Sequence, residues 1–310
     1  MRPVSFLAAV ASVAAQDVRE FIEIIVVDDS TEGISLDTVQ KAAGATEIRI
    51  VRPIPGVGQR SAGVAAARGQ WIAFLDDDDV WSPQKLRKQL ALAEEGRIGG
   101  REPIISCRLR HSFDGTDRLV EGVPERVIGP GQSVGEYLFL CRAPSVKRAS
   151  LYTSTLLASR SLCLEVEWRR IPRHQDWDWL LRAGSRPNVD VIHHPEDLVT
   201  VHLGSLGSIS ASPDWRSSLH WASQSARPHL THQAYADFIA AQVLRYALNA
   251  RSLSGVSKAL AELWRCRQVP SSQALVVGFA GLLPRKALQK LMSVPSRMRT
   301  RVRQPAAGPR

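Results

Sequence analysis

The sequence predicts an α/β fold, with a mostly parallel, Rossmann-like sheet flanked by helices and a helical C-terminal extension. Short apolar runs rich in β-branched residues alternate with helical patterns over residues 3–95, and the loops between them are short. Two of these runs end in acids, at Asp28-Asp29 and at residues 76–79. Ligands of open α/β sheets bind at the carboxyl ends of strands, so these acids mark the expected site.

Local signals define the N-terminal elements. Pro3 suits the first turn of a helix, Ser35 is placed to cap a helix that Gly44 ends, and Ser82-Pro83 pairs an N-cap with proline at the first helical position. The run at 71–75 should be a strand buried on both faces, as in a parallel sheet. The expected elements are helices over 3–16, 35–43, 59–68 and 82–95 and strands over 21–27, 47–51 and 71–75.

The periodicity is weaker after Gly96. Strands are expected over 104–110, 118–123, 152–159, 189–193 and 198–202, and helices over 133–140, 177–182 and 215–250. Three regions follow from this pattern: a domain over 1–212 that carries the sheet, a helical extension over 213–262, and a basic, partly apolar tail over 263–310.

Composition excludes several classes of protein. The apolar fraction of 44% and charged fraction of 23% are typical of a soluble globular protein. The four cysteines show no C-x-x-C spacing, which argues against a zinc site or a disulfide framework and fits a reducing compartment. No secretory signal is recognisable in residues 1–16, so we expect a cytoplasmic protein.

The net charge of +10 is concentrated at the end of the chain, where residues 263–310 hold ten basic residues and no acid. The apolar run at 274–283 is too short to span a bilayer. Apolar and basic residues together favour a segment lying on the inner face of the cell membrane. A helix docked on the domain, followed by a solvated disordered tail, explains the pattern equally well. A nucleic-acid surface is not favoured, because no aromatic residues interleave the basic ones in a recognisable motif.

Four consecutive aspartates, Asp76 to Asp79, would repel one another without a counter-charge. A divalent cation is the simplest way to stabilise them, and carboxylate oxygens suit Mg²⁺ or Mn²⁺. The alternative is a solvated acidic turn in which Asp79 or Ser82 caps the next helix. A further acid, Asp176, stands at an expected helix start, where the macrodipole would favour its ionised, basic form. Alone, it is also explained as a plain N-cap.

These pieces resemble family 2 glycosyltransferases of the GT-A fold. The matching segments are EIIVVDDS at 23–30, RSAGVAAARG at 60–69 and FLDDDDVW at 74–81, followed by TSTL at 153–156 and RHQDWDWLLR at 173–182. The resemblance covers about residues 3–210. The order and spacing of the first three segments are specific, whereas each segment alone is a weak signal.

The resemblance implies roles for individual residues. Asp29 would bind the nucleotide base while Asp28 supports its loop, and Arg60 would lie near the nucleotide. Asp176 matches the position of the catalytic base. Asp76-Asp77-Asp78 would form the DxD motif, with Asp76 and Asp77 on the nucleotide sugar and Asp78 on the metal, and His202 would add a metal or diphosphate contact.

The activity implied is an inverting transfer from a nucleotide-diphosphate sugar to a glycan or lipid-linked acceptor. A divalent cation, Mn²⁺ or Mg²⁺, and the nearby arginine would neutralise the leaving diphosphate. A positioned carboxylate would take the proton of the acceptor hydroxyl as it attacks. Polysaccharide biosynthesis is the setting that the family implies.

The sequence departs from the family pattern at its start. The family's first apolar strand, which ends in Pro-Thr-x-Asn, is absent before the helix at 3–16. We therefore expect Val26 and its neighbours to expose apolar surface and unpaired backbone groups. Ser61 stands where Asn commonly follows the arginine.

Two other functions are compatible with parts of the pattern. Asp76-x-Asp78-x-Val80 after an apolar strand also resembles the first motif of haloacid-dehalogenase-type phosphotransferases, although that class leaves Asp28-Asp29 unexplained. A degenerate, non-catalytic GT-A binding module would account for the missing strand.

Overall fold

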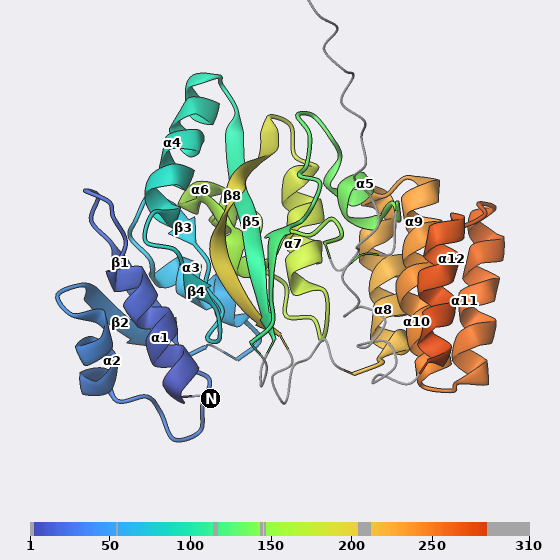
Figure 1. Cartoon of the computed structure of the whole chain (residues 1–310), viewed down its shortest axis with the longest axis horizontal. Helices are drawn as coiled ribbons and strands as arrows, with labels where there is room; N and C mark the ends of the chain where they lie inside the picture. Colours follow the sequence, from blue (N-terminus) through green and yellow to red (C-terminus); the bar gives the residue numbers. More distant parts are fainter. Residues whose placement is uncertain are drawn as a thin grey trace, which may run out of the picture.

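The computed structural model describes residues 3–53, 55–113, 117–142, 145, 147–203 and 212–283. A mixed sheet lies at the centre, helices cover it, and a separate helical layer packs at one end (Figure 1). The expected motif after His202, the loop at 53–58 and the basic tail extend into residues outside this description: 204–211, 54 and 284–310 respectively.

The first elements form where local signals predict them. Helix α1 spans Pro3–Ala14, β1 spans Glu23–Val27, and α2 spans Leu36–Ala43 with Ser35 as N-cap and Gly44 as C-cap. Gly44 has a φ of 59°, a conformation that glycine adopts without steric cost. Strand β2 (Glu47–Val51) and helix α3 (Gln59–Ala66) follow.

Strands β1 and β2 pair in parallel and form a two-stranded sheet of their own. Contrary to our expectation, Ile24 and Val26 of β1 are buried, because they belong to one apolar cluster with Phe6, Val10 and other side chains. The predicted exposed apolar surface around Val26 is therefore wrong.

The expected α/β fold class is confirmed, and the larger sheet is mixed rather than purely parallel. Its order is β3-β7-β5-β8-β4, with β6 paired to β5. Within this sheet β5 and β8 run parallel, while the pairs β3–β7, β5–β7, β4–β8 and β5–β6 are antiparallel. The strands are β3 (Trp71–Ala73), β4 (Val80–Trp81), β5 (Glu102–Phe113), β6 (Leu119–Val123), β7 (Leu157–Ser159) and β8 (Val189–Leu203).

Three further boundaries differ from the sequence prediction. Helix α4 spans Lys85–Ile98, later than the expected Ser82-Pro83 start, because Val80–Trp81 first pairs with β8. Residues 152–159 divide into a 3₁₀ turn at Thr153–Thr155 (η1) and β7. The two strands expected over 189–202 are one long strand, β8, whose pairing with β5 shifts register after Cys107. The remaining helices that flank the sheet are α5 (Val134–Phe139), α6 (Arg160–Glu165) and α7 (Gln175–Gly184).

The helical layer is built around one long helical run, α9 (His232–Phe238), η5 (Ile239–Leu244) and α10 (Arg245–Asn249), whose middle is π-helical. Helices α11 (Leu253–Cys266) and α12 (Ser272–Phe279) both pack against it. None of the described helices is long and apolar enough to cross a membrane. The layer also contains α8 (Trp215–Trp221), η3 (Ala222–Ala226), η4 (Arg227–His229) and η6 (Ala280–Leu282).

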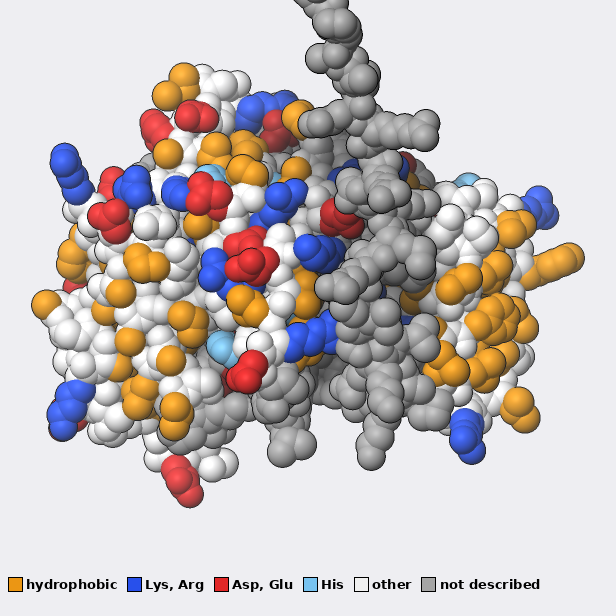
Figure 2. All heavy atoms as spheres, in the orientation of Figure 1, with side chains coloured by type: hydrophobic (Ala, Val, Ile, Leu, Met, Phe, Trp, Pro, Cys, Tyr) orange, Lys and Arg blue, Asp and Glu red, His pale blue; other side chains and the backbone are white. Residues whose placement is uncertain are grey.

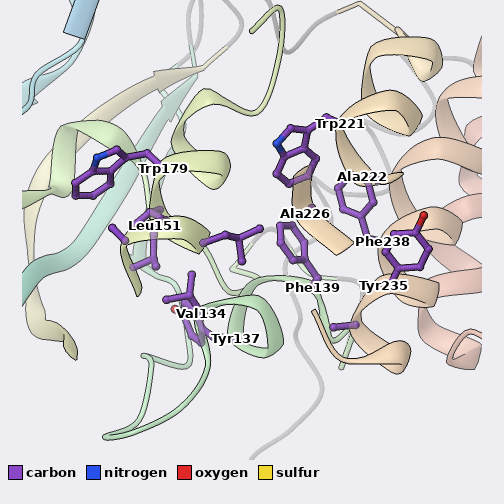
Figure 3. Packing of buried hydrophobic residues seen from close by; sticks show 14 of the residues in the cluster. Val134, Tyr137, Phe139, Leu151, Trp179, Trp221, Ala222, Ala226, Tyr235 and Phe238 are labelled. Carbon is purple, nitrogen blue, oxygen red and sulfur yellow. The ribbon is translucent and has the colours of Figure 1, made fainter. Parts of the chain in front are cut away.

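One apolar cluster joins the sheet to the helical layer. Figure 3 shows Trp179 on the sheet side and Phe139, Trp221 and Phe238 at the junction. The rings of Phe139 and Phe238 lie edge to face at 5.2 Å between centroids, a favourable aromatic geometry. The second cluster lies under α1, α2 and α4. The helical layer therefore shares its core with the sheet that carries the acids.

Candidate active site

The acid run after β3 forms a turn closed by a backbone hydrogen bond of 3.2 Å from the Asp79 N–H to the Asp76 carbonyl. Asp79 is buried and accepts hydrogen bonds from the Ser154 hydroxyl at 2.5 Å and from the His202 N–H at 3.2 Å. Burial, together with the neighbouring charge of Asp76, raises the pKa of Asp79 to about 8. Asp77 is exposed. Asp79 thus anchors the turn, and the aspartates before it are more accessible.

His202, near the end of β8, lies against this turn. Its Nδ1 atom is 2.7 Å from the backbone oxygen of Asp78, which fixes the orientation of the imidazole ring. The two residues assigned to the metal by sequence are therefore neighbours, although 124 positions separate them in the chain.

Arg60, on the first turn of α3, connects two parts of the site. One guanidinium nitrogen donates to Asp76 Oδ1 at 2.7 Å and another donates to Gln175 Oε1 at 3.1 Å. The guanidinium also lies 5.0 Å from the ring centroid of Trp168, within cation–π range. Arg60 therefore ties the acid turn to the start of α7, where Asp176 is the next residue.

Asp28 and Asp29 follow β1, and the two side chains have different environments. Asp28 is buried and accepts hydrogen bonds from Ser30 and from the Ile34 N–H. Burial alone would raise the pKa of Asp28, but these bonds and the charge of Arg52 outweigh it and lower the pKa. Asp29 is exposed and accepts a hydrogen bond of 3.1 Å from Gln59, the residue before Arg60. Both acidic loops therefore meet the first turn of α3.

Asp176 is the second residue of α7, and its N-cap is His174. Its carboxylate accepts the N–H of Trp177 at 2.9 Å. Burial raises the pKa of Asp176, opposed by this hydrogen bond and by the positive charge of Arg60. The sequence analysis expected the helix dipole to favour the ionised form of Asp176, whereas desolvation by burial is the largest effect on its pKa. A carboxylate with a raised pKa is a stronger base.

The structure adds polar residues to which the sequence argument gave no role. Ser154 accepts the Asp76 N–H at 3.1 Å and donates to Asp79, so its hydroxyl holds the acid turn from both ends. Gln175 positions Arg60. Both lie within the segments TSTL and RHQDWDWLLR, whose presence was the signal that could have identified them.

The donor atoms of the site suit a cation that also binds a ligand. Within the described part of the chain, no three His, Cys, Asp or Glu side chains converge as a cation cage. Mg²⁺ is commonly held by one or two carboxylates together with substrate phosphates. Asp78 and the adjacent His202 are consistent with such a partial ligand set.

The mixed α/β sheet with its flanking helices has the GT-A fold, which solved glycosyltransferase structures share. Residues 3–113 match the model of the family "Glycosyl transferase family 2". Over these residues the chain is similar to family 2 glycosyltransferases, and the match favours this class over the phosphotransferase alternative.

Relatives with similar sequences are named as glycosyltransferases or as polysaccharide-biosynthesis proteins. The amylovoran biosynthesis glycosyltransferase AmsB of Erwinia amylovora is 29% identical over 248 residues, covering 77% of this chain and 79% of AmsB. The succinoglycan biosynthesis protein ExoO of Rhizobium meliloti is 37% identical over 97 residues, 29% of this chain and 26% of ExoO. The Escherichia coli protein WfaP, named a UDP-Glc:α-D-GlcNAc-diphosphoundecaprenol β-1,3-glucosyltransferase, is 32% identical over 93 residues, 29% of this chain and 37% of WfaP.

Solved structures share the fold. S. aureus TarS 1–349 in complex with UDP-GlcNAc matches with a TM-score of 0.54 and 14% identity, covering 89% of this chain and 87% of that one. The same TarS segment in complex with UDP matches with a TM-score of 0.57 and 14% identity, covering 89% and 82%.

Proposed function

We propose that this protein transfers a sugar from a nucleotide-diphosphate sugar to a glycan or lipid-linked acceptor during the assembly of a polysaccharide. The observation that carries this proposal is the bridge made by Arg60, which places the acid turn beside the helix start that bears Asp176. Donor-binding and proton-accepting groups are thus adjacent, as one displacement step requires. The relatives named for polysaccharides and a lipid diphosphate, and the neighbours solved with UDP and UDP-GlcNAc, support the substrate classes.

Each residue of the site has its own role in binding the donor and the cation. Asp28 shapes the loop from which Asp29 reaches the nucleotide base, while Asp76 and Asp77 bind the nucleotide sugar. Asp78 and His202 would hold Mn²⁺ or Mg²⁺, which supplies charge neutralisation for the leaving diphosphate. Arg60 adds a fixed positive charge on the same side.

Asp176 acts as the general base. It takes the proton of the acceptor hydroxyl as the oxygen attacks the anomeric carbon, so that one displacement inverts the configuration. Its raised pKa favours this role, because a stronger base removes the proton more readily. We also propose that the protein works in the cytoplasm at the inner membrane face, where lipid-linked acceptors are presented.

The experiment that tests the base is Asp176→Asn. After a screen of nucleotide sugars with Mn²⁺ identifies the donor, transfer by the variant should fall by about 10²-fold or more, while calorimetry shows donor affinity close to wild type. Asp190→Asn, which alters a carboxylate paired with Arg101 away from the site, is the matched control and should leave both unchanged. Retained turnover by Asp176→Asn would reject Asp176 as the base.

A further inference from the structure

Helices α11 and α12 expose an apolar surface on the outer side of the helical layer. On α11, Leu253, Leu260 and Trp264 are exposed at spacings of seven and four residues, which places them on one face of the helix. On α12, Val276 and Phe279 are exposed three residues apart. Figure 2 shows apolar side chains gathered over this end of the molecule. We call this set, together with Leu282 of η6, the α11–α12 apolar face.

The exposure of these side chains is large for apolar groups. Trp264 is 85% exposed and Phe279 is 54% exposed, while the opposite side of α11 buries Ala259 and Cys266. Contiguous exposed apolar patches mark interaction sites in folded proteins. The outer stripe of α11 is therefore available to a partner while its inner stripe holds the core.

The segment of the chain that contains this face is rich in positive charge. Residues 238–310 contain thirteen lysines and arginines and a single acid, Glu262, so this region carries more positive charge than the net +10 of the whole chain. Glu262 is buried and accepts hydrogen bonds from Arg227, Tyr235 and Arg265. Lys258 and Arg265 are exposed on α11, beside the apolar stripe.

From these observations we propose that the α11–α12 apolar face docks onto an anionic lipid surface. Exposed aromatic and aliphatic side chains flanked by Lys and Arg are the features of a surface that lies in the membrane interface. Tryptophan in particular is favoured at the boundary between headgroups and acyl chains. None of the helices in the described part of the chain is a candidate membrane span.

A second copy of this chain is a less suitable partner. In a two-fold symmetric contact the same positive region would oppose itself, and like charges across an interface are unfavourable. An anionic membrane instead supplies the opposite charge. The chain also continues directly from Leu283 into residues 284–310, which contain eight basic residues and no acid and would add to that attraction.

The test is co-sedimentation of the full chain with phosphatidylcholine vesicles, with and without phosphatidylglycerol, in the absence of sugar donor. The wild type should bind the anionic vesicles preferentially, and added salt should weaken binding without abolishing it. The double variant Trp264→Ser, Phe279→Ser should bind about tenfold or more weakly, because it removes two exposed side chains that would insert into the membrane interface. Phe21→Ser, which alters a 76% exposed aromatic residue elsewhere, is the matched control and should bind like wild type.

Three results would overturn the proposal: no preference for phosphatidylglycerol, unchanged binding by the double variant, or a wild-type dimer that the double variant abolishes. Urea unfolding of each variant checks that the fold is intact. If the double variant is destabilised, the single change Trp264→Ser carries the same test. Vesicle binding is measured without sugar transfer. A negative vesicle result therefore does not contradict the proposed transfer activity, and absence of transfer does not contradict the proposed membrane contact.

Discussion

Asp79 and Asp78 are adjacent residues with different tasks. Asp79 is buried against Ser154 and the His202 N–H, so it holds the turn, whereas Asp78 is more accessible and its backbone oxygen contacts the His202 ring. In the sequence the two residues belong to a run of four consecutive aspartates. The role of Asp79 as the anchor of the turn depends on contacts with segments more than 70 positions away.

The cation hypothesis makes a direct prediction at Asp78. Asp78→Ala should remove most of the Mn²⁺ dependence of UDP binding, because the proposed carboxylate ligand is lost. Calorimetric titration of UDP with and without Mn²⁺ measures this. Asp17→Ala, at an exposed carboxylate paired with Arg87, is the control and should bind UDP as wild type does. Binding of UDP by the wild type that is independent of metal would contradict the hypothesis.

His193 on β8 makes a prediction about pH. Its ring is buried, and burial lowers its pKa to about 3. Between about pH 6.5 and pH 3 the unfolded chain binds a proton at this residue and the folded protein does not, so stability falls as pH falls through that window. His193→Leu should flatten this dependence and raise the unfolding free energy at pH 5 by on the order of 2 kcal/mol.

Urea unfolding at several pH values from about 4 to about 7, which covers most of this window, would measure the pH dependence of stability. His220→Leu changes an exposed histidine and serves as the comparison, with little effect on the pH dependence expected. If the free energy of unfolding of His193→Leu falls with pH as steeply as that of the wild type, other groups dominate the pH dependence of stability.

Among the elements, α11 depends on a close approach to two neighbours. A Cβ atom added at Gly255 would lie 2.7 Å from the Trp215 ring and 2.8 Å from the Ala247 side chain. Gly255→Ala should therefore destabilise the protein by about 1–3 kcal/mol, despite the better helix propensity of alanine. Thermal unfolding would measure the loss. Ser254→Ala, at the exposed neighbouring position, should cause no loss, and equal behaviour of the two variants would contradict this packing argument.

Elements with local signals were the predictable ones. Ser35 and Gly44 bound α2, and strand β2 spans the predicted residues, because caps and apolar runs act within a few residues. The direction of β3 was not predictable, since it is set by pairing with β7 about 85 residues later. The start of α4 was displaced for a similar reason, the pairing of Val80–Trp81 with β8.

In the candidate site, too, local motifs were predictable from the sequence and contacts between distant segments were not. Sequence motifs identified Arg60, Asp76 and Asp176 as members of one site, whereas the link through Gln175 needed the three-dimensional structure. The raised pKa of Asp176 also could not be predicted, because it depends on burial that no local pattern encodes.

At the scale of the molecule, the sheet and the helical layer share one core. Trp221 of α8 is buried, its indole N–H donates to Asp178 of α7 at 3.1 Å, and its ring lies 4.8 Å from that of His174. The helix that bears Asp176 is thereby held by the C-terminal layer. We expect the two parts to unfold in one transition.

Trp221→Ala tests this coupling. It should lower the unfolding free energy by about 3–5 kcal/mol and shift the loss of UDP binding and of helical signal to the same lower temperature. Trp264→Ala, at an exposed tryptophan, is the control and should unfold near the wild-type temperature. Separate transitions for the two signals would show that the layers are energetically independent.

The bridge made by Arg60 has a consequence for the order of events during turnover. One guanidinium holds Asp76 and Gln175 at the same time, so a donor that engages Asp76 competes for a group that also positions the start of α7. Binding of the donor and binding of the acceptor are therefore coupled. We expect a compulsory sequence of addition, donor before acceptor, that initial-rate kinetics with product inhibition would reveal.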